Sequence, residues 1–524
     1  MKRYLLVASL LFLGVMSFQV YESTVNDIKN AFQTGELQSC QQLVSLFEDR
    51  IDAYEPTLNA FISINTNAQS DAAALDNLTQ EEKASKPLWC IPFVAKDNYA
   101  TSSKEFDLPT TVGSIYLKDQ YTEVNAYMVQ RLLDAGGVLM GKTNMAEFAI
   151  SGSNTNSSVA GQTRNAYDLT KSPEGSSGGT ATAVAASFCV LGLGTDTQGS
   201  IQNPASVQSL VGLRSTTAML DWEGIFPALD FQDVGGPITR SVSDLSYAMQ
   251  AIDSGKPAGV FFYPTPLYPV NPPQQSLPLD GVRIGFMNST INPAKFSDHM
   301  VDPQVQEGMN QMINDLKTLG ATVVILKGVA DRSHLSTFND NIGLECGCSE
   351  EKASINYYLE HRVTPSSPAH NWVEFLDGLS NDSAEPDSII KSMNLVNKCA
   401  LHDYTAVYFK TCQNYHFYKT ALARWLEENL EKENLDGYLY ASMMETAQTI
   451  GTSMPASFSF LSAYSTLPAL VIQAGTSTSV DPPMPFGASL MARRYQEKQL
   501  LDWAIALEAL HNHRQAPDTY APPL

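Results

Sequence analysis

Residues 172–201 read SPEGSSGGTATAVAASFCVLGLGTDTQGSI, a loop rich in glycine and serine that leads into a run of small residues and then an apolar run. Glycine permits tight backbone geometry, and small side chains let a helix pack closely against its neighbours. The apolar run 187–193 predicts a buried strand, after which Ser200 lies on a turn. A serine there is well placed to attack a substrate, beside backbone N–H groups that can stabilise a developing oxyanion.

Two common uses of such a segment do not fit. The loop lacks the Gly-Lys-Ser/Thr ending of a P-loop and the glycine spacing of a dinucleotide fingerprint. None of the eight histidines lies near a Gly-x-Ser-x-Gly elbow. The sequence therefore gives no support to a phosphate-binding loop or to the triad of an α/β-hydrolase.

A lysine closes a second apolar stretch, which reads IPFVAKDN at residues 91–98. A free lysine side chain has a pKa near 10.4 and is a cation at neutral pH. Burial among apolar neighbours disfavours the charged form and lowers that pKa. A lysine made neutral in this way can act as a base, so no histidine is needed.

Together these stretches resemble the amidase signature family, whose members are hydrolases with a Lys-Ser-Ser triad. The resemblance continues through GKTNMAEF at 141–148 and TRNAYDL at 163–169 to GGPITRSVSD at 235–244. It is looser in the C-terminal half. The resemblance implies that the chain is an amidase, a hydrolase of linear amide C–N bonds.

The resemblance also assigns roles to individual residues. Lys96 takes the place of the family's triad lysine, Ser176 that of the bridging serine and Ser200 that of the acylated nucleophile. These roles imply a relay in which a proton passes from Ser200 through Ser176 to a neutral Lys96 and returns to the departing amine. In the family the bridging serine follows a cis peptide bond, which here is expected at Gly175–Ser176. No metal or cofactor is expected. The oxyanion hole is expected from the backbone N–H groups of Thr197, Gln198, Gly199 and Ser200.

Short apolar strands alternate with helical patterns along the chain, which favours an α/β fold. The family resemblance makes this a central mixed β-sheet covered by helices on both faces. Ser39 followed by Gln42 predicts the start of a helix that runs to about Pro56. Asp302 and Pro303 predict the start of another helix, which ends before Gly320. Strands are expected at 137–140, 282–287, 321–326 and 467–472.

The chain of 524 residues is expected to form one domain from residue 18 to residue 524, after a signal peptide at 1–17. Lys2 and Arg3 precede an apolar run that is too short to span a bilayer comfortably, as in signal peptides. A retained N-terminal anchor is the alternative. Helices are expected at about 24–54, and Pro264 to Pro278 reads as a surface connection.

The region at about 330–435 is rich in Asn, Ser, His and aromatic residues and has less regular periodicity than its flanks. We interpret it as an insertion that shapes a pocket, or else as a helical excursion on the surface.

The net charge limits the classes of partner, and the cysteine count limits the disulfide pairing. The net charge of -22, from 33 basic and 55 acidic residues, argues against nucleic acid as a partner. The seven cysteines leave at least one unpaired in a monomer, and their pairing cannot be assigned from sequence. We interpret Cys346 with Cys348, and His511 with His513, as structural or incidental residues rather than as metal ligands. No stable membrane span is expected after signal removal, and the oligomeric state cannot be predicted.

The residue at position 202 limits the class of substrate. Many family members have arginine two residues after the nucleophile, whereas this chain has Gln202. Loss of that fixed charge argues against a substrate held there by its carboxylate, and against a tRNA-linked amidotransferase. The chain looks most like exported peptide amidases, so we expect a secreted or periplasmic enzyme that acts on a peptide C-terminal amide or a small amide. An esterase, a fatty-acid amide hydrolase and a catalytically silent binding protein are the alternatives.

Overall fold

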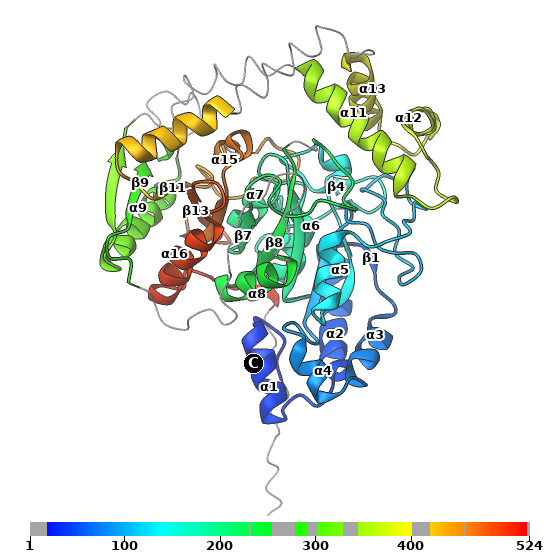
Figure 1. Ribbon diagram of the computed structural model, residues 1–524, viewed down its shortest axis with the longest axis horizontal. Helices are drawn as coiled ribbons and strands as arrows, with labels where there is room; N and C mark the ends of the chain where they lie inside the picture. The colour runs from blue at the N-terminus through cyan, green and yellow to red at the C-terminus, as the bar shows by residue number, and fades with distance from the viewer. Residues whose placement is uncertain are drawn as a thin grey trace, which may run out of the picture.

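The computed structural model describes residues 18–229, 232–253, 278–291, 301–327, 344–400, 420–454 and 456–520. The expected signal peptide at 1–17 and nearly all of the expected connection at 264–278 lie outside these residues. A mixed sheet of 11 strands forms the centre of the molecule, with helices on both of its faces (Figure 1). Its strands lie in the order β1 (Phe61–Ile64), β3 (Val138–Thr143), β2 (Pro92–Lys96), β6 (Leu191–Asp196), β8 (Val234–Thr239), β7 (Val211–Arg214), β12 (Ala469–Ser477), β13 (Met484–Ala492), β11 (Gly437–Ala441), β9 (Arg283–Met287) and β10 (Thr322–Leu326).

The order of the strands matters most around β2 and β6. These two strands are parallel neighbours, and Val94 pairs with Gly192 across them from a distant part of the chain. The carboxyl ends of parallel strands meet at the same edge of a sheet. Residues that follow Lys96 and Asp196 are therefore brought to one place.

The longer helices lie around the sheet or at one end of the molecule (Figure 1). They are α1 (Val25–Thr34), α2 (Cys40–Leu58), α3 (Ala68–Asp76), α5 (Tyr127–Asp134), α6 (Gly178–Ala185), α8 (Val242–Ile252), α9 (Pro303–Thr318), α11 (Leu344–His361), α12 (Trp372–Asn381), α13 (Asp387–Cys399) and α16 (Glu497–Leu510). Shorter helices are α4 (Gln80–Ser85), α7 (Gln202–Val207) and α15 (Phe460–Ser465). Every residue of α6 is buried, as its small side chains allow.

Local signals located two helices well. The Ser39 hydroxyl accepts a hydrogen bond from the Gln42 amide at the start of α2. The Asp302 carboxylate does the same for the Gln304 amide at the start of α9, and Gly320 follows that helix with a left-handed φ of 98°. These side chains satisfy amide groups that a helix leaves without partners in its first turn.

The strand expected at 187–193 begins later, at Leu191, and continues to Asp196. The chain first has to turn out of α6. Ser187 adopts a left-handed φ of 58°, and the Phe188 amide donates to the Ala183 carbonyl. The apolar run is thus shared between a helix end and a strand, which its hydrophobicity alone does not reveal.

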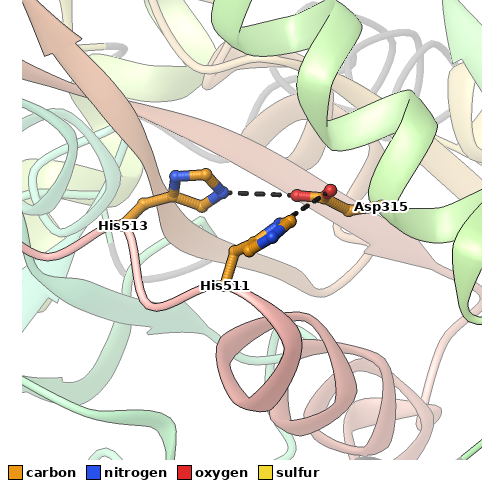
Figure 2. Close-up of side chains that lie close together, drawn as sticks. All are labelled: Asp315, His511 and His513. Atoms are coloured by element: carbon orange, nitrogen blue, oxygen red, sulfur yellow. Dashed lines mark hydrogen bonds and ion pairs between the residues drawn. The ribbon is translucent and has the colours of Figure 1, made fainter.

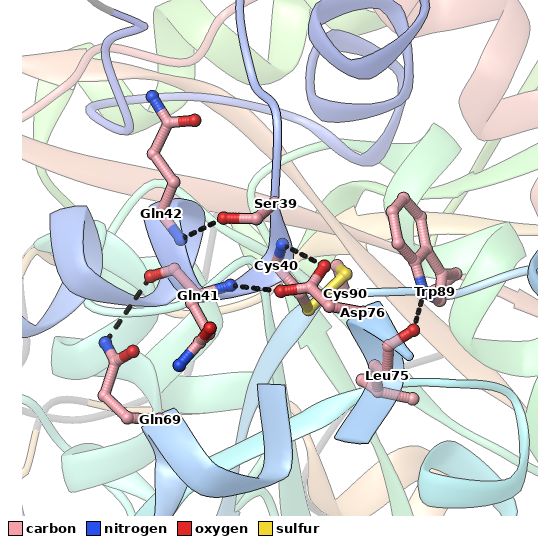
Figure 3. The surroundings of a disulfide bond; sticks show 9 residues. All are labelled: Ser39, Cys40, Gln41, Gln42, Gln69, Leu75, Asp76, Trp89 and Cys90. Carbon is pink, nitrogen blue, oxygen red and sulfur yellow. Dashed lines mark hydrogen bonds between the residues drawn. A yellow bond between two sulfur atoms is a disulfide. The ribbon is translucent and has the colours of Figure 1, made fainter. Parts of the chain in front are cut away.

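A disulfide joins the N-terminal helices to the sheet. Cys40 opens α2, and Cys90 lies two residues before β2 (Figure 3). The Asp76 carboxylate accepts hydrogen bonds from the amides of Cys40 and Gln41 beside this bond. Cys348 is disulfide-bonded as well, whereas Cys189 is a free, buried thiol.

The helices α11, α12 and α13 occupy most of the described part of the region expected at 330–435, and they lie together at the end of the molecule opposite α1 (Figure 1). They pack on the body of the molecule through an apolar cluster that includes Phe148, Phe226 and Phe375. A cavity of about 410 Å³ opens between α11 and the segment 222–227. Whether this region selects a substrate stays a prediction.

Candidate active site

The three residues expected to form a triad lie together. Lys96 ends β2, Ser176 lies just before α6, and Ser200 lies on the turn between β6 and α7. The Nζ atom of Lys96 is 2.7 Å from the Ser176 hydroxyl, and the Ser176 amide donates to the Ser200 hydroxyl over 3.1 Å. All three side chains are buried, and Ser200 keeps an exposed fraction of 8%. Ser200 is thus the member of the group that retains some contact with solvent.

Burial sets the protonation state of Lys96. The side chain is wholly buried, and desolvation lowers the pKa of its amine from 10.5 to about 7, although nearby Asp233 and Asp196 act in the opposite direction. The amine also contacts the Thr195 hydroxyl at 2.7 Å, and that hydroxyl accepts a second hydrogen bond from the Asn98 side chain. At neutral pH a large fraction of the amine is therefore uncharged and able to accept a proton.

Sequence reasoning did not identify Thr195 or Asn98. Their positions in the sequence could have indicated both residues. Asn98 follows Lys96 by two residues, and Thr195 lies at the end of the strand that leads to Ser200. What the sequence could not supply was the pairing of β2 with β6, which brings these side chains to the same amine.

The structure corrects one detail of the expected relay. Among the described residues the cis peptide bond is Asp481–Pro482, so Gly175–Ser176 is not cis. A trans bond is favoured for a non-proline residue by about 2.5 to 4 kcal/mol. Two hydrogen bonds fix the backbone of Gly175 beside this peptide bond. The Gly175 amide donates to the Gly152 carbonyl, and the Gly175 carbonyl accepts from the Thr155 hydroxyl.

In this geometry it is the amide of Ser176, rather than its hydroxyl, that contacts the Ser200 hydroxyl. The link from Lys96 to Ser176 is therefore present, and a bond between the two serine hydroxyls is not among the contacts of the described chain.

The space around position 175 admits only glycine. A Cβ atom on Gly175 would lie 2.8 Å from Pro204 and 3.2 Å from the Cα atom of Ser200.

A buried ion pair holds the turn that carries Ser200. The Asp196 carboxylate accepts hydrogen bonds from the amides of Gly199, Ile201 and Gln202 at 2.7, 3.0 and 3.2 Å. Arg214 on β7 pairs with the same carboxylate at 3.0 Å, and both side chains are fully buried. Sequence reasoning missed this pair because its partners belong to separate strands.

The same contacts bear on the expected oxyanion hole. The Gly199 amide already donates to Asp196, so it is engaged in this structure. Within the described chain, no acceptor takes the amide hydrogens of Thr197, Gln198 and Ser200. For these three amides the oxyanion hole stays a prediction.

Gln202 lies in the interior, where many relatives of the expected family have a cation. Its side-chain amide donates to Asp196 over 3.2 Å, and its carbonyl oxygen accepts from Ser462 over 3.1 Å. The side chain is thus part of a hydrogen-bond network to which it adds no charge.

No helix in the described ranges has both the length and the apolar composition needed to cross a bilayer.

Comparison with protein families gives one match over most of the chain. The family model described as Amidase matches residues 42–501. The chain is 37% identical over 292 residues to the A subunit of glutamyl-tRNA(Gln) amidotransferase from Lawsonia intracellularis (strain PHE/MN1-00), covering 55% of this chain and 57% of that protein. This match therefore spans a little over half the length of the relative.

Longer matches exist at lower identity. The protein of the same name from Prochlorococcus marinus (strain NATL2A) is 29% identical over 510 residues, covering 95% of this chain and 99% of that protein. Among solved structures, native peptide amidase from Stenotrophomonas maltophilia superposes with a TM-score of 0.79 at 26% identity, covering 95% of this chain and 98% of the other. The fold is thus shared over nearly the whole length of both chains.

Proposed function

The chain belongs to the amidase family, whose members act on amide C–N bonds, and on that premise we propose that it hydrolyses a carboxylic amide through an acyl-enzyme on Ser200. The observation that carries this proposal is the contact between the Lys96 amine and the Ser176 hydroxyl, 2.7 Å apart in a fully buried setting. A buried amine with a pKa of about 7 is a suitable base near neutral pH.

The proposed reaction has two stages. The Ser200 hydroxyl attacks the amide carbonyl while its proton passes by way of Ser176 to Lys96. The tetrahedral oxyanion is stabilised by free backbone amides of the Ser200 turn. The same proton is then returned to the nitrogen of the leaving group, and the C–N bond breaks. Water attacks the resulting ester with the same base, which releases the acid and restores Ser200.

The proton relay requires a rotation of the Ser176 hydroxyl. In the free enzyme the Ser176 amide contacts Ser200, and catalytic hydrogen bonds are often long or poorly aligned before substrate binds. The proposal therefore requires the Ser176 hydroxyl to turn from Lys96 towards Ser200 when the substrate binds.

We favour a peptide C-terminal amide or another small uncharged amide as substrate. The likeness to peptide amidase supports this choice. The neutral side chain of Gln202 also supports this choice, because it cannot form an ion pair with a substrate carboxylate.

A second candidate is an amidotransferase reaction, in which ammonia from an amide is passed on rather than released. The 37% identity to the Lawsonia intracellularis protein favours it. The neutral Gln202 argues against it, because this side chain lacks the positive charge that would hold a substrate carboxylate. The net charge of -22 also argues against it, because a tRNA partner is a polyanion.

The decisive experiment is a hydrolysis screen over amidated peptides, fatty amides, aromatic amides, matched esters and free glutamine. Ser200→Ala is the blank, and Ser85→Ala, at the exposed end of α4, is the matched control. Release of ammonia from amidated peptides, absent in Ser200→Ala alone, supports the proposal. Turnover of esters without amides, or of glutamine alone, would replace it with one of the alternatives.

Export is the second part of the proposal. The basic and apolar pattern of residues 2–16 and the disulfide between Cys40 and Cys90 support it, because disulfides persist mainly in oxidising compartments. Expression of the full chain in its source cells, followed by N-terminal sequencing of protein from the medium or periplasm, tests it. An intact N-terminus on protein found only in the cytoplasm would contradict export.

A further inference from the structure

Three potential metal ligands meet at the junction of α9 and the C-terminal segment, far from Ser200 in sequence and on other elements. Asp315 comes from the last turns of α9, His511 caps α16, and His513 follows two residues later (Figure 2). The His511 Nδ1 atom is 2.9 Å from one Asp315 oxygen, and the His513 Nε2 atom is 3.3 Å from the other. Both rings thus direct a nitrogen at the same carboxylate.

The spacing of these atoms is close to that of a metal site. One ligand atom from each residue lies within 4.8 Å of the others. In a tetrahedral zinc site with metal–ligand bonds of about 2.0 to 2.2 Å, ligand atoms lie about 3.3 to 3.5 Å apart. Zinc binding would therefore require both imidazole rings, the exposed ring of His511 and the half-buried ring of His513, to turn until the ligand atoms reach that spacing.

The surroundings of Asp315 favour a built site. Its side chain is 2% exposed, and a buried carboxylate is costly unless it is paired or bound to a metal. The Gln311 side chain donates to one of its oxygens over 2.7 Å, which fixes the orientation of the carboxylate as outer-shell partners of metal ligands do. His511 is 51% exposed, so the cluster is open to water on one side.

We propose that Asp315, His511 and His513 bind a zinc ion, with water as the fourth ligand. Two imidazole nitrogens and one carboxylate suit Zn²⁺ and its transition-metal neighbours, whereas Ca²⁺ and Mg²⁺ prefer oxygen ligands alone. The open side leaves the ion reachable from solvent.

The ion would act as a clamp on the C-terminal segment. Beyond His513 this segment continues to Arg514, which forms an ion pair with Glu22, and to Pro517, whose carbonyl accepts from the Tyr21 hydroxyl. It therefore ties α9 and α16 to the N-terminal segment. Metal binding to the folded form alone raises stability, so the clamp predicts a protein that melts at a higher temperature with zinc. The inference does not depend on the proposed function.

The test is a calorimetric titration of Zn²⁺ into the full chain, purified without a histidine tag and stripped with a chelator. One ion should bind per chain, and the melting temperature should rise. His511→Gln and His513→Gln should each weaken binding by at least about tenfold, as even outer-shell changes do. His361→Gln is the matched control, because His361 is an exposed imidazole at the end of α11 with a carbonyl as its partner.

Three results would overturn the inference. The first is a wild-type chain whose melting temperature zinc leaves unchanged. The second is binding that His511→Gln, His513→Gln and His361→Gln all retain equally, which would locate the ion elsewhere. Co²⁺ provides a readout on the wild-type chain alone, because a four-coordinate site gives much stronger visible absorption than the hydrated ion. Absence of that absorption would mean that the cluster is held by hydrogen bonds only.

Discussion

The amine of Lys96 lies 2.7 Å from the hydroxyl of Ser176, although the two residues are 80 positions apart. The contact exists because β2 and β6 are parallel neighbours and because α6 begins directly after Ser176 and Ser177. An amine in such a place loses most of its hydration, and its pKa falls to about 7. The fold therefore creates a base from a residue that is ordinarily a cation.

Removal of the Ser176 hydroxyl should abolish the relay without disturbing the fold. Ser176→Ala is expected to lower kcat/KM for an amide by roughly 10²- to 10⁴-fold, the usual contribution of general acid–base catalysis. Steady-state kinetics and thermal melting measure the two effects. Ser177→Ala is the neighbouring control, because its hydroxyl only bonds the backbone of Thr195. Ser177→Ala should lower the free energy of unfolding by about 1 kcal/mol for each hydrogen bond lost. It should lower kcat/KM much less than Ser176→Ala does. Equal losses of activity in both variants would contradict a relay.

Activity should depend on the neutral form of Lys96. Protonation below pH 7 removes the base, so kcat/KM should fall about tenfold for each unit of pH under the pKa of about 7 and level off above it. Lys96→Arg stays a cation at every accessible pH and should be inactive throughout. A pH profile of kcat/KM measures this. Activity in Lys96→Arg that equals the wild-type value would exclude a base at this position.

The same buried amine should cost stability. Its pKa is lowered from 10.5 in the unfolded chain to about 7 in the fold, so the unfolded state binds more protons between these values. Stability therefore rises with pH through that window. Lys96→Met should melt at a higher temperature than the wild type at pH 7, and the gap should narrow towards pH 10. A variant that melts lower at pH 7 would show that the amine contributes more through its hydrogen bonds than burial costs.

Asp196 should matter for both stability and activity. Asp196→Ala leaves Arg214 buried without its partner, at a cost of roughly 3 to 5 kcal/mol, and frees the amides that hold the Ser200 turn. Denaturant unfolding and amide turnover measure the two losses. The double variant Asp196→Ala with Arg214→Met should recover part of the stability but none of the activity. Recovery of both would assign Asp196 a role in stability alone.

The disulfide between Cys40 and Cys90 should stabilise the N-terminal helices. It closes a loop across a separation of 50 residues, and loops of that size contribute about 2 to 4 kcal/mol. The double variant Cys40→Ala with Cys90→Ala is expected to lose that amount in denaturant unfolding, and either single variant should lose as much. Because Cys348 is also disulfide-bonded, a reductant is not a substitute for these variants. Unchanged unfolding in the double variant would contradict the expectation.

The backbone around Lys96, Ser176 and Ser200 could be predicted in part from local sequence, whereas the roles of these residues came from the family resemblance. Glycine next to Ser176, an apolar run before Ser200 and an apolar strand that ends at Lys96 each report on backbone geometry within a few residues. The caps at Ser39 and Asp302 are local for the same reason. Such signals depend on neighbours along the chain, so a single sequence carries them.

Contacts between distant elements could not be predicted in that way. The pairing of Asp196 with Arg214 needs the order of the strands, and the link of Cys40 with Cys90 needs the position of α2 on the sheet. His511 and His513 are two residues apart, but Asp315, which gives them a shared partner, comes from another helix. None of these partners leaves a periodic or compositional trace.

The proposed reaction requires an uncharged Lys96 that activates Ser200, and the most direct test is the pH dependence of labelling by a fluorophosphonate. Peptide mass spectrometry should find the phosphonyl group on Ser200, with a labelling rate that rises through pH 7 in the wild type and is almost lost in Lys96→Met. Labelling of a different serine, or a rate at Ser200 that neither pH nor Lys96→Met changes, would contradict it.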